Sequence, residues 1–465
     1  MLSALVLTLA PLGGASLAPP PATIPAPLES PYQADMAEAL EQLKRRCGSF
    51  FSQKDIDWKK VSRDFTKAAK KIKTDSEHLA LLVGLLARLQ DGHARVEPAA
   101  GGKYTWDNMP WPEEWRVPTK GPGFFLCRVG KKFYIREAWS SAAELGLVAG
   151  MEVTSIDEQS MKKWLPKKLT ELAERRSFSS EQHALFYALT RGLQGPEDSR
   201  LKVEFKDAKG KRKKRTITLS RASATPNGPA VLLPGYTSLG DSVRWAKTPE
   251  GFGYLHIRRI QDDLLKELDT ALAALGALET GAATHEDGTP GHERLPGLII
   301  DFRGNSGGGC DHDAFAGRFV PRGETIPRLT NSPLASAGPA PFGGPIVVIV
   351  DGTVVSAGET TSGMFKEDGR AYMIGESPTA GMSSQKETVS LPAGLFQLYV
   401  SVRSNKRAFN GGRGIEGIGV APHETVAFEP KDLAAGVDTL IKRASELLAD
   451  YPWRAVPYDA RDHGW

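Results

Sequence analysis

The sequence predicts a multidomain α/β protein, and three observations support this prediction. The chain has 465 residues, more than one hydrophobic core usually organises. Apolar residues recur at helical spacing from Tyr32 to Gln90, whereas the stretch from Gly251 to Val350 alternates strand-like and helical patterns. The hydrophobic fraction of 40% and the charged fraction of 25% are those of an ordinary globular protein.

Charge and cysteine content exclude several classes of protein. The formal net charge of +4 implies no strong field for nucleic acid, and we expect no nucleic-acid partner. The one dense basic run, Lys209–Arg215, lies between two alternating strand-like segments and fits a solvated hairpin tip. Cys47, Cys127 and Cys310 form no CxxC pair, which argues against a disulfide scaffold and a zinc ribbon. We expect neither a metal nor a cofactor.

The first 18 residues have the character of a secretory signal peptide. Residues 2–18 are apolar and end on small residues, with Ala18 at the expected cleavage site. Pro11 and two glycines interrupt the run, which makes it a poor membrane-spanning helix. Residues 19–31 are rich in proline and predict an extended linker. We therefore expect a secreted protein, or one of the periplasm or cell envelope, without a stable membrane span.

A helical N-terminal domain is expected over residues 32–98. Its most apolar helix covers 79–89, with Asp75 and Ser76 as candidate N-caps. This domain ends on the turn Asp91-Gly92-His93.

Residues 99–120 form a loop rich in tryptophan. Trp106, Trp111 and Trp115 stand among prolines and acidic residues. Such a loop could line a peptide groove, or its tryptophans could pin it against a neighbouring domain. The sequence leaves both interpretations open.

Residues 121–222 predict a β-rich module that resembles PDZ domains. The resemblance rests on the segment 141–157, which reads SAAELGLVAGMEVTSID. Upstream, Gly121, Gly123 and Phe124 are similar to the PDZ loop that points backbone N–H groups at a peptide's terminal carboxylate. Pro122 has no N–H, so one donor of that loop is missing.

Residues 223–430 predict an α/β core with parallel strands. Strands alternate there with helices, and in such sheets ligands bind beyond the carboxyl ends of the strands. The expected elements are a strand at 251–257, a helix at 262–278, an exposed insertion at 280–294, a strand at 298–301, a helix at 313–319, a strand at 345–350 and a helix at about 356–365. Residues 431–465 add a closing helix, 432–448, and an aromatic tail, 451–465.

Ser356 is the candidate nucleophile. It lies between a predicted buried strand and the start of a predicted helix. The unpaired N–H groups and the partial positive charge of a helix N-terminus stabilise an oxyanion. The N–H of Ala357 is then the natural first oxyanion donor. The competing interpretation is a serine that merely caps the helix.

The glycines 307–309 are the second motif. Without side chains, Gly307 and Gly308 let the backbone approach a substrate carbonyl and complete an oxyanion hole. A phosphate site is disfavoured because no Gly-Lys-Ser/Thr follows. The run Cys310-Asp311-His312-Asp313 is more consistent with a surface loop than with a metal site, because consecutive ligands cannot all face one ion.

The combined motifs resemble peptidase family S41, the tail-specific and tricorn-type core proteases. The motifs are DFRGNSGG at 301–308, VSAGE at 355–359, GESPTAG at 375–381 and EGIGVAP at 416–422. The resemblance implies a ClpP/crotonase-like catalytic core behind a helical domain and a PDZ-like module. It covers about residues 32–430.

The resemblance also implies the base. The tail-specific branch has a lysine where this chain has Met382, and Lys386 lies four residues on. The tricorn-like branch uses a histidine and a glutamate that align with His93 and Glu416. In that branch a serine precedes the histidine, whereas Gly92 occupies the position here.

Two hypotheses for the function follow. The first is a secreted serine endopeptidase in which His93 activates Ser356 and Glu416 orients the imidazole. Its substrates are proteins or peptides, which the PDZ-like module could hold by their C-termini. The second is a non-catalytic peptide- or ligand-binding protein with the same fold, because fold alone does not imply function. The oligomeric state is open.

Overall fold

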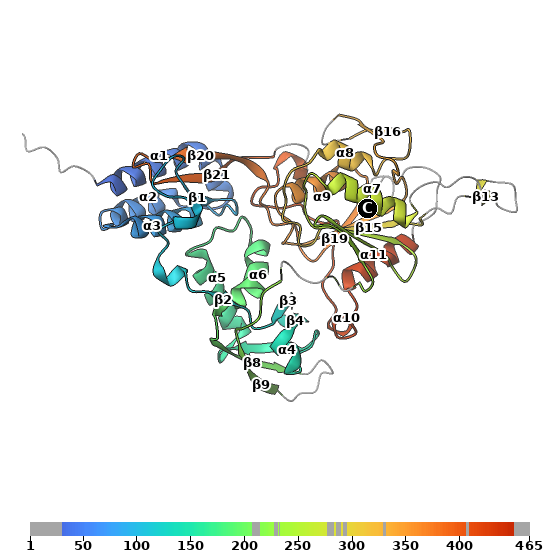
Figure 1. Cartoon of the computed structure of the whole chain (residues 1–465), viewed down its shortest axis with the longest axis horizontal. Helices are drawn as coiled ribbons and strands as arrows, with labels where there is room; N and C mark the ends of the chain where they lie inside the picture. The colour runs from blue at the N-terminus through green and yellow to red at the C-terminus, as the bar shows by residue number, and fades with distance from the viewer. Residues whose placement is uncertain are drawn as a thin grey trace, which may run out of the picture.

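The computed structural model describes residues 30–206, 214–226, 231, 233–276, 295–328, 332–405 and 409–450, with the backbone of 283–284 and 290–291. The predicted signal peptide, most of the linker, the hairpin tip at 207–213, most of the insertion 280–294 and the tail 451–465 lie outside these residues. Figure 1 shows three lobes, which we call the helical lobe, the β-rich module and the α/β core. No described helix is both long enough and apolar enough to traverse a bilayer.

Three helices build the helical lobe: α1 (Pro31–Gln53), α2 (Trp58–Ala69) and α3 (Asp75–Ala87). The prediction that Asp75 or Ser76 caps α3 is wrong. The N-cap is Thr74, whose hydroxyl accepts the Glu77 N–H while the Glu77 carboxylate accepts the Thr74 N–H. This reciprocal pair satisfies two donors that a helix start otherwise leaves unpaired.

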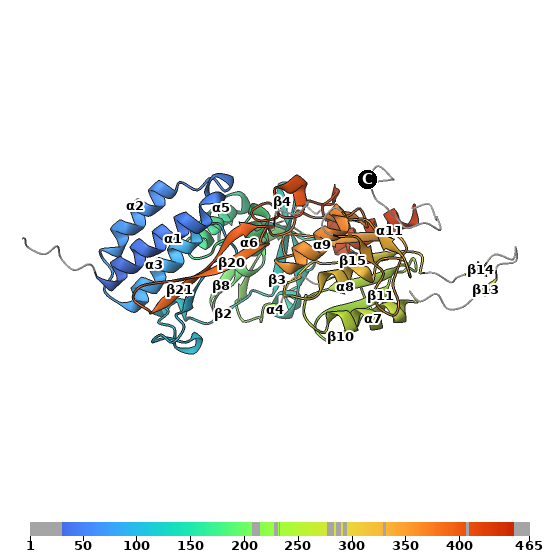
Figure 2. The same cartoon turned by 90° about the horizontal axis from the view of Figure 1, so that it is seen from above.

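Two strands from the C-terminal half complete the helical lobe. Strands β20 (Ser384–Ser390) and β21 (Phe396–Ser404) form an antiparallel hairpin, and β21 pairs with β1 (Arg95–Pro98). Phe396, Leu398 and Val400 are buried in the same core as the α1 and α3 leucines. Figure 2 shows this hairpin running from the α/β core to the helical lobe. The helical lobe therefore extends beyond residues 32–98, and the sequence did not predict its strands β20 and β21.

The tryptophan-rich loop lies against its neighbours. Its short helices are η1 (Trp106–Asn108) and η2 (Glu113–Trp115). Trp111 packs against the core of the helical lobe, and the Arg175 guanidinium of the β-rich module lies 4.9 Å from the Trp115 ring centroid. Trp106 stays 57% exposed. These contacts support the pinning interpretation for Trp111 and Trp115.

The β-rich module is a mainly antiparallel sheet with its own core. Its strand order is β3-β4-β5-β8-β9, with β6 paired to β5. Helices α5 and α6 pack on this sheet, with Trp164, Leu189 and Phe205 in the shared core. The elements are β3 (Phe124–Val129), β4 (Lys132–Ala138), α4 (Ser140–Glu144), β5 (Glu152–Ile156), β6 (Gln159–Ser160), α5 (Met161–Ala173), α6 (Glu181–Leu189), η3 (Arg191–Leu193), β8 (Arg200–Lys206) and β9 (Lys214–Ser220). The short strands β2 (Thr119–Lys120) and β7 (Gly195–Pro196) pair beside it.

The α/β core contains a seven-stranded sheet in the order β10-β11-β12-β15-β18-β19-β22. From β12 to β22 every pairing is parallel, as the sequence predicted, and β10, β11 and β12 are antiparallel. The strands are β10 (Thr237–Leu239), β11 (Val243–Lys247), β12 (Gly253–Ile257), β15 (Leu298–Asp301), β18 (Ile346–Val350), β19 (Tyr372–Gly375) and β22 (Glu424–Thr425).

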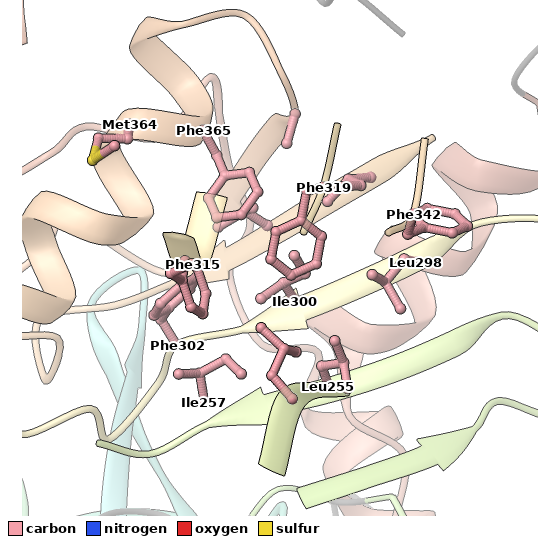
Figure 3. Packing of buried hydrophobic residues seen from close by; sticks show 14 of the residues in the cluster. Leu255, Ile257, Leu298, Ile300, Phe302, Phe315, Phe319, Phe342, Met364 and Phe365 are labelled. Atoms are coloured by element: carbon pink, nitrogen blue, oxygen red, sulfur yellow. The ribbon is translucent and has the colours of Figure 1, made fainter. Parts of the chain in front are cut away.

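Side chains alternate between the two faces of this sheet. Leu298 and Ile300 join the cluster under α7 (Leu264–Leu275), α8 (His312–Gly317) and α9 (Ala357–Glu367), which Figure 3 shows around Phe315, Phe319 and Phe365. Ile299 faces the opposite cluster, which includes α11 (Thr439–Ala449). This two-residue alternation is what a sheet buried on both faces requires.

The closing helix predicted at 432–448 is in fact two helices. Helix α10 (Pro430–Ala434) ends before Gly436, which has a φ of +71°. Asp438 then caps α11 by accepting the N–H groups of Leu440 and Ile441. A left-handed glycine and a strong N-cap are the usual means of ending one helix and starting another.

Candidate active site

Ser356 occupies a sharp turn between β18 and α9. Its φ of 56° and ψ of −123° are unusual for a residue with a side chain. The turn is closed by the Gly358 N–H, which donates to the Val355 carbonyl at 3.0 Å. Ser356 is also the N-cap residue of α9, in a capping box in which the Glu359 N–H faces the Ser356 side chain and the Glu359 carboxylate accepts the Ser356 N–H. The same serine lines a cavity, as a nucleophile must.

Glu359 holds this turn in place. Its buried carboxylate accepts the N–H of Ser356 at 3.1 Å and the N–H groups of Gly381 and Met382, each at 2.7 Å. Burial raises the pKa of Glu359 to about 8, and these donors, with the Thr379 hydroxyl, act in the opposite direction. Glu359 is not among the predicted site residues, although the three-residue spacing from Ser356 to Glu359 is that of a capping box.

The glycine loop after β15 is anchored by buried charges. The Arg303 guanidinium contacts the Asp301 carboxylate at 2.6 Å and the Asp438 carboxylate at 3.0 Å, and all three side chains are almost fully buried. Burial opposes ionisation of Asp301, but Arg303 outweighs it and holds the pKa of that carboxyl below its usual value. The loop is thus tied to the start of α11.

Asn305 joins the glycine loop to the serine turn. Its side-chain oxygen accepts the Gly307 N–H at 2.8 Å, and its carbonyl accepts the Val355 N–H at 3.1 Å. A Cβ on Gly307 would lie 2.7 Å from the Ser356 Cβ, so only glycine permits this approach. The Gly307 N–H is therefore adjacent to the serine but already has an acceptor.

Gly308 and Ala357 present N–H groups beside Ser356. Neither N–H donates to a backbone or side-chain acceptor among the described residues. Gly308 has a φ of +128°, and a Cβ there would overlap the Ile260 carbonyl oxygen. Both residues line a cavity of about 260 Å³ together with Ser356. Gly307 does not line it.

His93 lies in a second cluster, with Asp91 and Glu416. One potential ligand atom from each of the three residues lies within 4.8 Å of the others. Asp91 fixes the turn by accepting the His93 N–H at 2.9 Å and both the N–H and the hydroxyl of Ser401 in β21. Burial lowers the pKa of His93 to about 4, although Asp91 pulls it upward. The imidazole is therefore neutral at neutral pH.

Glu416 is held by residues from two other parts of the molecule. Its Oε1 accepts from Lys54 Nζ at 2.8 Å and from the Ser179 hydroxyl at 2.9 Å. Burial raises the pKa of Glu416 to about 7 against the attraction of Lys54. Ser179 also accepts the Gly92 N–H at 2.9 Å. A serine from the β-rich module thus contacts both Gly92 and Glu416, and no local pattern in the sequence indicated Lys54 or Ser179.

Two buried atoms in this cluster lack partners. His93 Nδ1 and Glu416 Oε2 make no hydrogen bond within the described part of the chain. By contrast, the Asp91 oxygens and Glu416 Oε1 already accept donors, one of them a lysine. Because a cation would compete with these donors, the cluster fits a hydrogen-bonded acid–imidazole group better than a metal site.

Met382 separates the two clusters. Its side chain lies against Gly92, where a Cβ would be 2.6 Å from Met382 Sδ, and its N–H shares Glu359 with the Ser356 N–H. Among the described residues no hydrogen bond joins His93 to Ser356. Lys386, in contrast, lines the Ser356 cavity, and burial lowers its pKa. The charge on Lys386 also lowers the pKa of His93, so these two groups are close.

The residues compared above with a carboxylate-binding loop are buried. The Gly121 N–H donates to the Ser223 carbonyl at 2.8 Å, and the Gly123 carbonyl accepts the Trp139 N–H at 2.7 Å. Phe124 pairs with Ala138 in the sheet and is 1% exposed. In the described conformation these residues therefore stabilise the β-rich module and do not form an open binding loop.

Comparison with known proteins supports the fold of the chain and the family of its α/β core. Residues 251–426 match the model of peptidase family S41. The structure of mature CPAF complexed with lactacystin is similar over 90% of this chain and 98% of that chain, with a TM-score of 0.60 and 13% identity. The structure of a suspected peptidase from Parabacteroides merdae is similar over 90% and 96%, with a TM-score of 0.51 and 17% identity. Residues 251–426 therefore form the core of a family S41 peptidase, and the fold of the whole chain is similar to that of solved members.

Proposed function

We propose that the protein is a serine endopeptidase with Ser356 as its nucleophile. One observation carries the proposal: Ser356 sits on a turn with positive φ, in a cavity that it shares with two N–H groups that donate to no described acceptor. This is the arrangement that acyl transfer needs, because the negative charge develops on the carbonyl oxygen as the hydroxyl attacks. Gly308 and Ala357 supply the oxyanion donors, whereas Gly307 supports the turn.

His93 is the proposed base, and Glu416 its partner. A neutral imidazole takes the Ser356 proton as the tetrahedral intermediate forms, and returns it to the leaving amine. His93 Nδ1 and Glu416 Oε2 are both buried and unpartnered, so a bond between them would satisfy both atoms and stabilise the imidazolium. This step requires the His93 turn to approach Ser356 past Met382, since catalytic contacts often tighten only when substrate binds.

Lys386 is the rival base, because it already lines the Ser356 cavity and its pKa is lowered by burial. The two candidate bases predict different effects of substitution on kcat/KM and different pH profiles of kcat/KM. If His93 is the base, His93→Gln loses roughly 100-fold or more in kcat/KM, while Lys386→Met retains most of it. The reverse result would reassign the base.

A fluorophosphonate probe tests the nucleophile. The parent protein should be labelled, and Ser356→Ala should not. Ser220→Ala, on the exposed face of β9, is the matched control and should label like the parent. Labelling that persists in Ser356→Ala would refute the assignment.

A second candidate function is peptide or ligand binding without catalysis. It is favoured by the lack of a bond between His93 and Ser356 and by Met382 lying between their turns. Absence of probe labelling and of peptide hydrolysis at every pH tested, with peptide binding retained, would establish this alternative.

We further infer export, from the apolar residues 2–18 and the small residue Ala18. The full chain should appear outside the cytoplasm and start at residue 19, whereas a chain lacking residues 2–18 should stay inside. Terminal sequencing and fractionation decide this. Capture of substrate C-termini by Gly121, Gly123 and Phe124 is not part of the proposal, because Gly121 is bonded to Ser223 and Pro122 has no N–H.

A further inference from the structure

A second cavity, of about 300 Å³, adjoins the serine turn. On the core side it is lined by Gly304 and Ser306 of the glycine loop and by Thr353 and Val355. Val355 directly precedes Ser356, and Ser306 directly precedes Gly307. The opposite wall comes from α6 and η3 of the β-rich module. A substrate residue in this cavity would therefore lie next to the bond that Ser356 attacks.

The polar lining of this cavity is basic. Arg191, Arg258 and Arg259 line it together with His183, and none of the described lining residues is acidic. The guanidinium groups of Arg258 and Arg259 make no ion pair or hydrogen bond with any described residue. His183 Nδ1 is buried and has no hydrogen-bond partner among the described residues.

Arg191 and Arg258 are half-buried and Arg259 is exposed. Two buried arginines elsewhere in the chain have acidic partners. Arg303 is paired with Asp301 and Asp438, and Arg136 lies 3.4 Å from Glu376. Buried charges in proteins are normally paired, because the uncompensated charge loses its hydration. Burial, Arg244 and Arg259 lower the pKa of Arg258, and Asp241 acts in the opposite direction. A bound anion would offset the repulsion among these arginines.

We propose that this cavity is a subsite for a carboxylate of the substrate, contacted by Arg258, Arg259 and Arg191. The inference rests on the proposed function, since it names the substrate class of the same site. Guanidinium groups bind carboxylates through paired, charge-assisted hydrogen bonds. Phe125, Phe186 and Tyr187 supply apolar wall for the stem of the residue that bears the carboxylate. The enzyme thus cleaves close to an acidic side chain or close to a free C-terminus.

Binding to the inactive protein tests the subsite without requiring catalysis. The probes are three fluorescein-labelled pentapeptides of alanine and phenylalanine that end in glutamate amide, glutamine amide, or glutamine with a free carboxylate. With Ser356→Ala protein, fluorescence polarisation should show at least one acidic peptide binding about 10-fold to 100-fold more tightly than the glutamine amide. The preference should shrink at about 1 M salt, because Arg259 is exposed.

Variants connect the preference to the cavity. Arg258→Gln with Arg259→Gln should abolish it, and Arg259→Gln alone, at an exposed position, should reduce it without affecting folding. Arg63→Gln, on an exposed face of α2, is the matched control and should leave the preference intact. Equal affinities for all three peptides, or a preference that survives the double substitution in a folded protein, would overturn the inference.

Cleavage of a peptide library by the parent protein then separates the two carboxylate sources. Enrichment of Asp and Glu at one fixed position from the cut indicates side-chain recognition. Cuts at a constant distance from the peptide end indicate recognition of the terminus. Preferential binding of the acidic peptides without any cleavage would refute the proposed peptidase function and leave the subsite in place. Cleavage without a carboxylate near the cut would refute the subsite and leave the peptidase function in place.

Discussion

Lys54 is expected to control the charge of Glu416, and Lys54→Met tests this. The Lys54 side chain is 3% exposed and that of Glu416 is fully buried, with 2.8 Å between Nζ and Oε1. Removing the ammonium while its partner stays ionised would leave an uncompensated buried carboxylate, which costs about 3–5 kcal/mol of folding free energy. The carboxylate can avoid this cost only by taking up a proton.

The loss of folding stability in Lys54→Met should therefore depend on pH. Burial already raises the pKa of Glu416 from 4.5 to about 7 with Lys54 present, and Lys54→Met should raise this pKa further. For an acid with a raised folded-state pKa, the folded protein binds more protons than the unfolded chain, so stability falls as pH rises through the folded pKa. We expect a small loss of stability at about pH 5.5, where Glu416 is protonated in both proteins. At about pH 8.5 the loss should be larger by up to about 2 kcal/mol, because each pH unit above the parent pKa of about 7 adds at most about 1.4 kcal/mol.

Urea denaturation at both pH values measures this difference. The double variant Lys54→Met/Glu416→Gln should recover much of the stability lost at the higher pH, since it removes the stranded charge. Lys60→Met breaks the exposed pair with Asp64 and should change little at either pH. Equal losses at the two pH values, or additive effects of the two substitutions, would refute the reasoning.

Three further predictions concern the proposed mechanism. If His93 is the base and ionised Glu416 is its partner, kcat/KM should fall as pH drops through about 7, where Glu416 takes up a proton, and fall again near pH 4, where the buried imidazole does. A rise in kcat/KM confined to alkaline pH would contradict this. Gly308→Ala should abolish probe labelling, since a Cβ would overlap the Ile260 carbonyl, whereas Gly309→Ala, with nothing within 4 Å, should retain it. Glu359→Gln should lower the rate of labelling roughly 10-fold or more, because an amide cannot accept all the donors that hold the serine turn, and an unchanged rate would exclude that role.

Much of the α/β core could be predicted from the sequence. The strands 298–301 and 346–350 are continuous apolar runs, and the motifs that follow them lie at the carboxyl ends of parallel strands, as the structure confirms. The prediction of one closing helix at 432–448 was wrong, because the left-handed Gly436 and the N-cap Asp438 divide an otherwise continuous helical pattern into α10 and α11.

The sequence alone determined the turn that carries Ser356 and the glycine loop beside it, because both depend on short-range backbone geometry within a few residues. The tertiary structure alone decided which side chains surround them. Pairing of β21 with β1 brings Asp91 to Ser401, and a lysine from the helical lobe and a serine from the β-rich module meet at Glu416. Such contacts join residues hundreds of positions apart, and they leave no periodic pattern in the chain, because only the packing of the three lobes makes them neighbours.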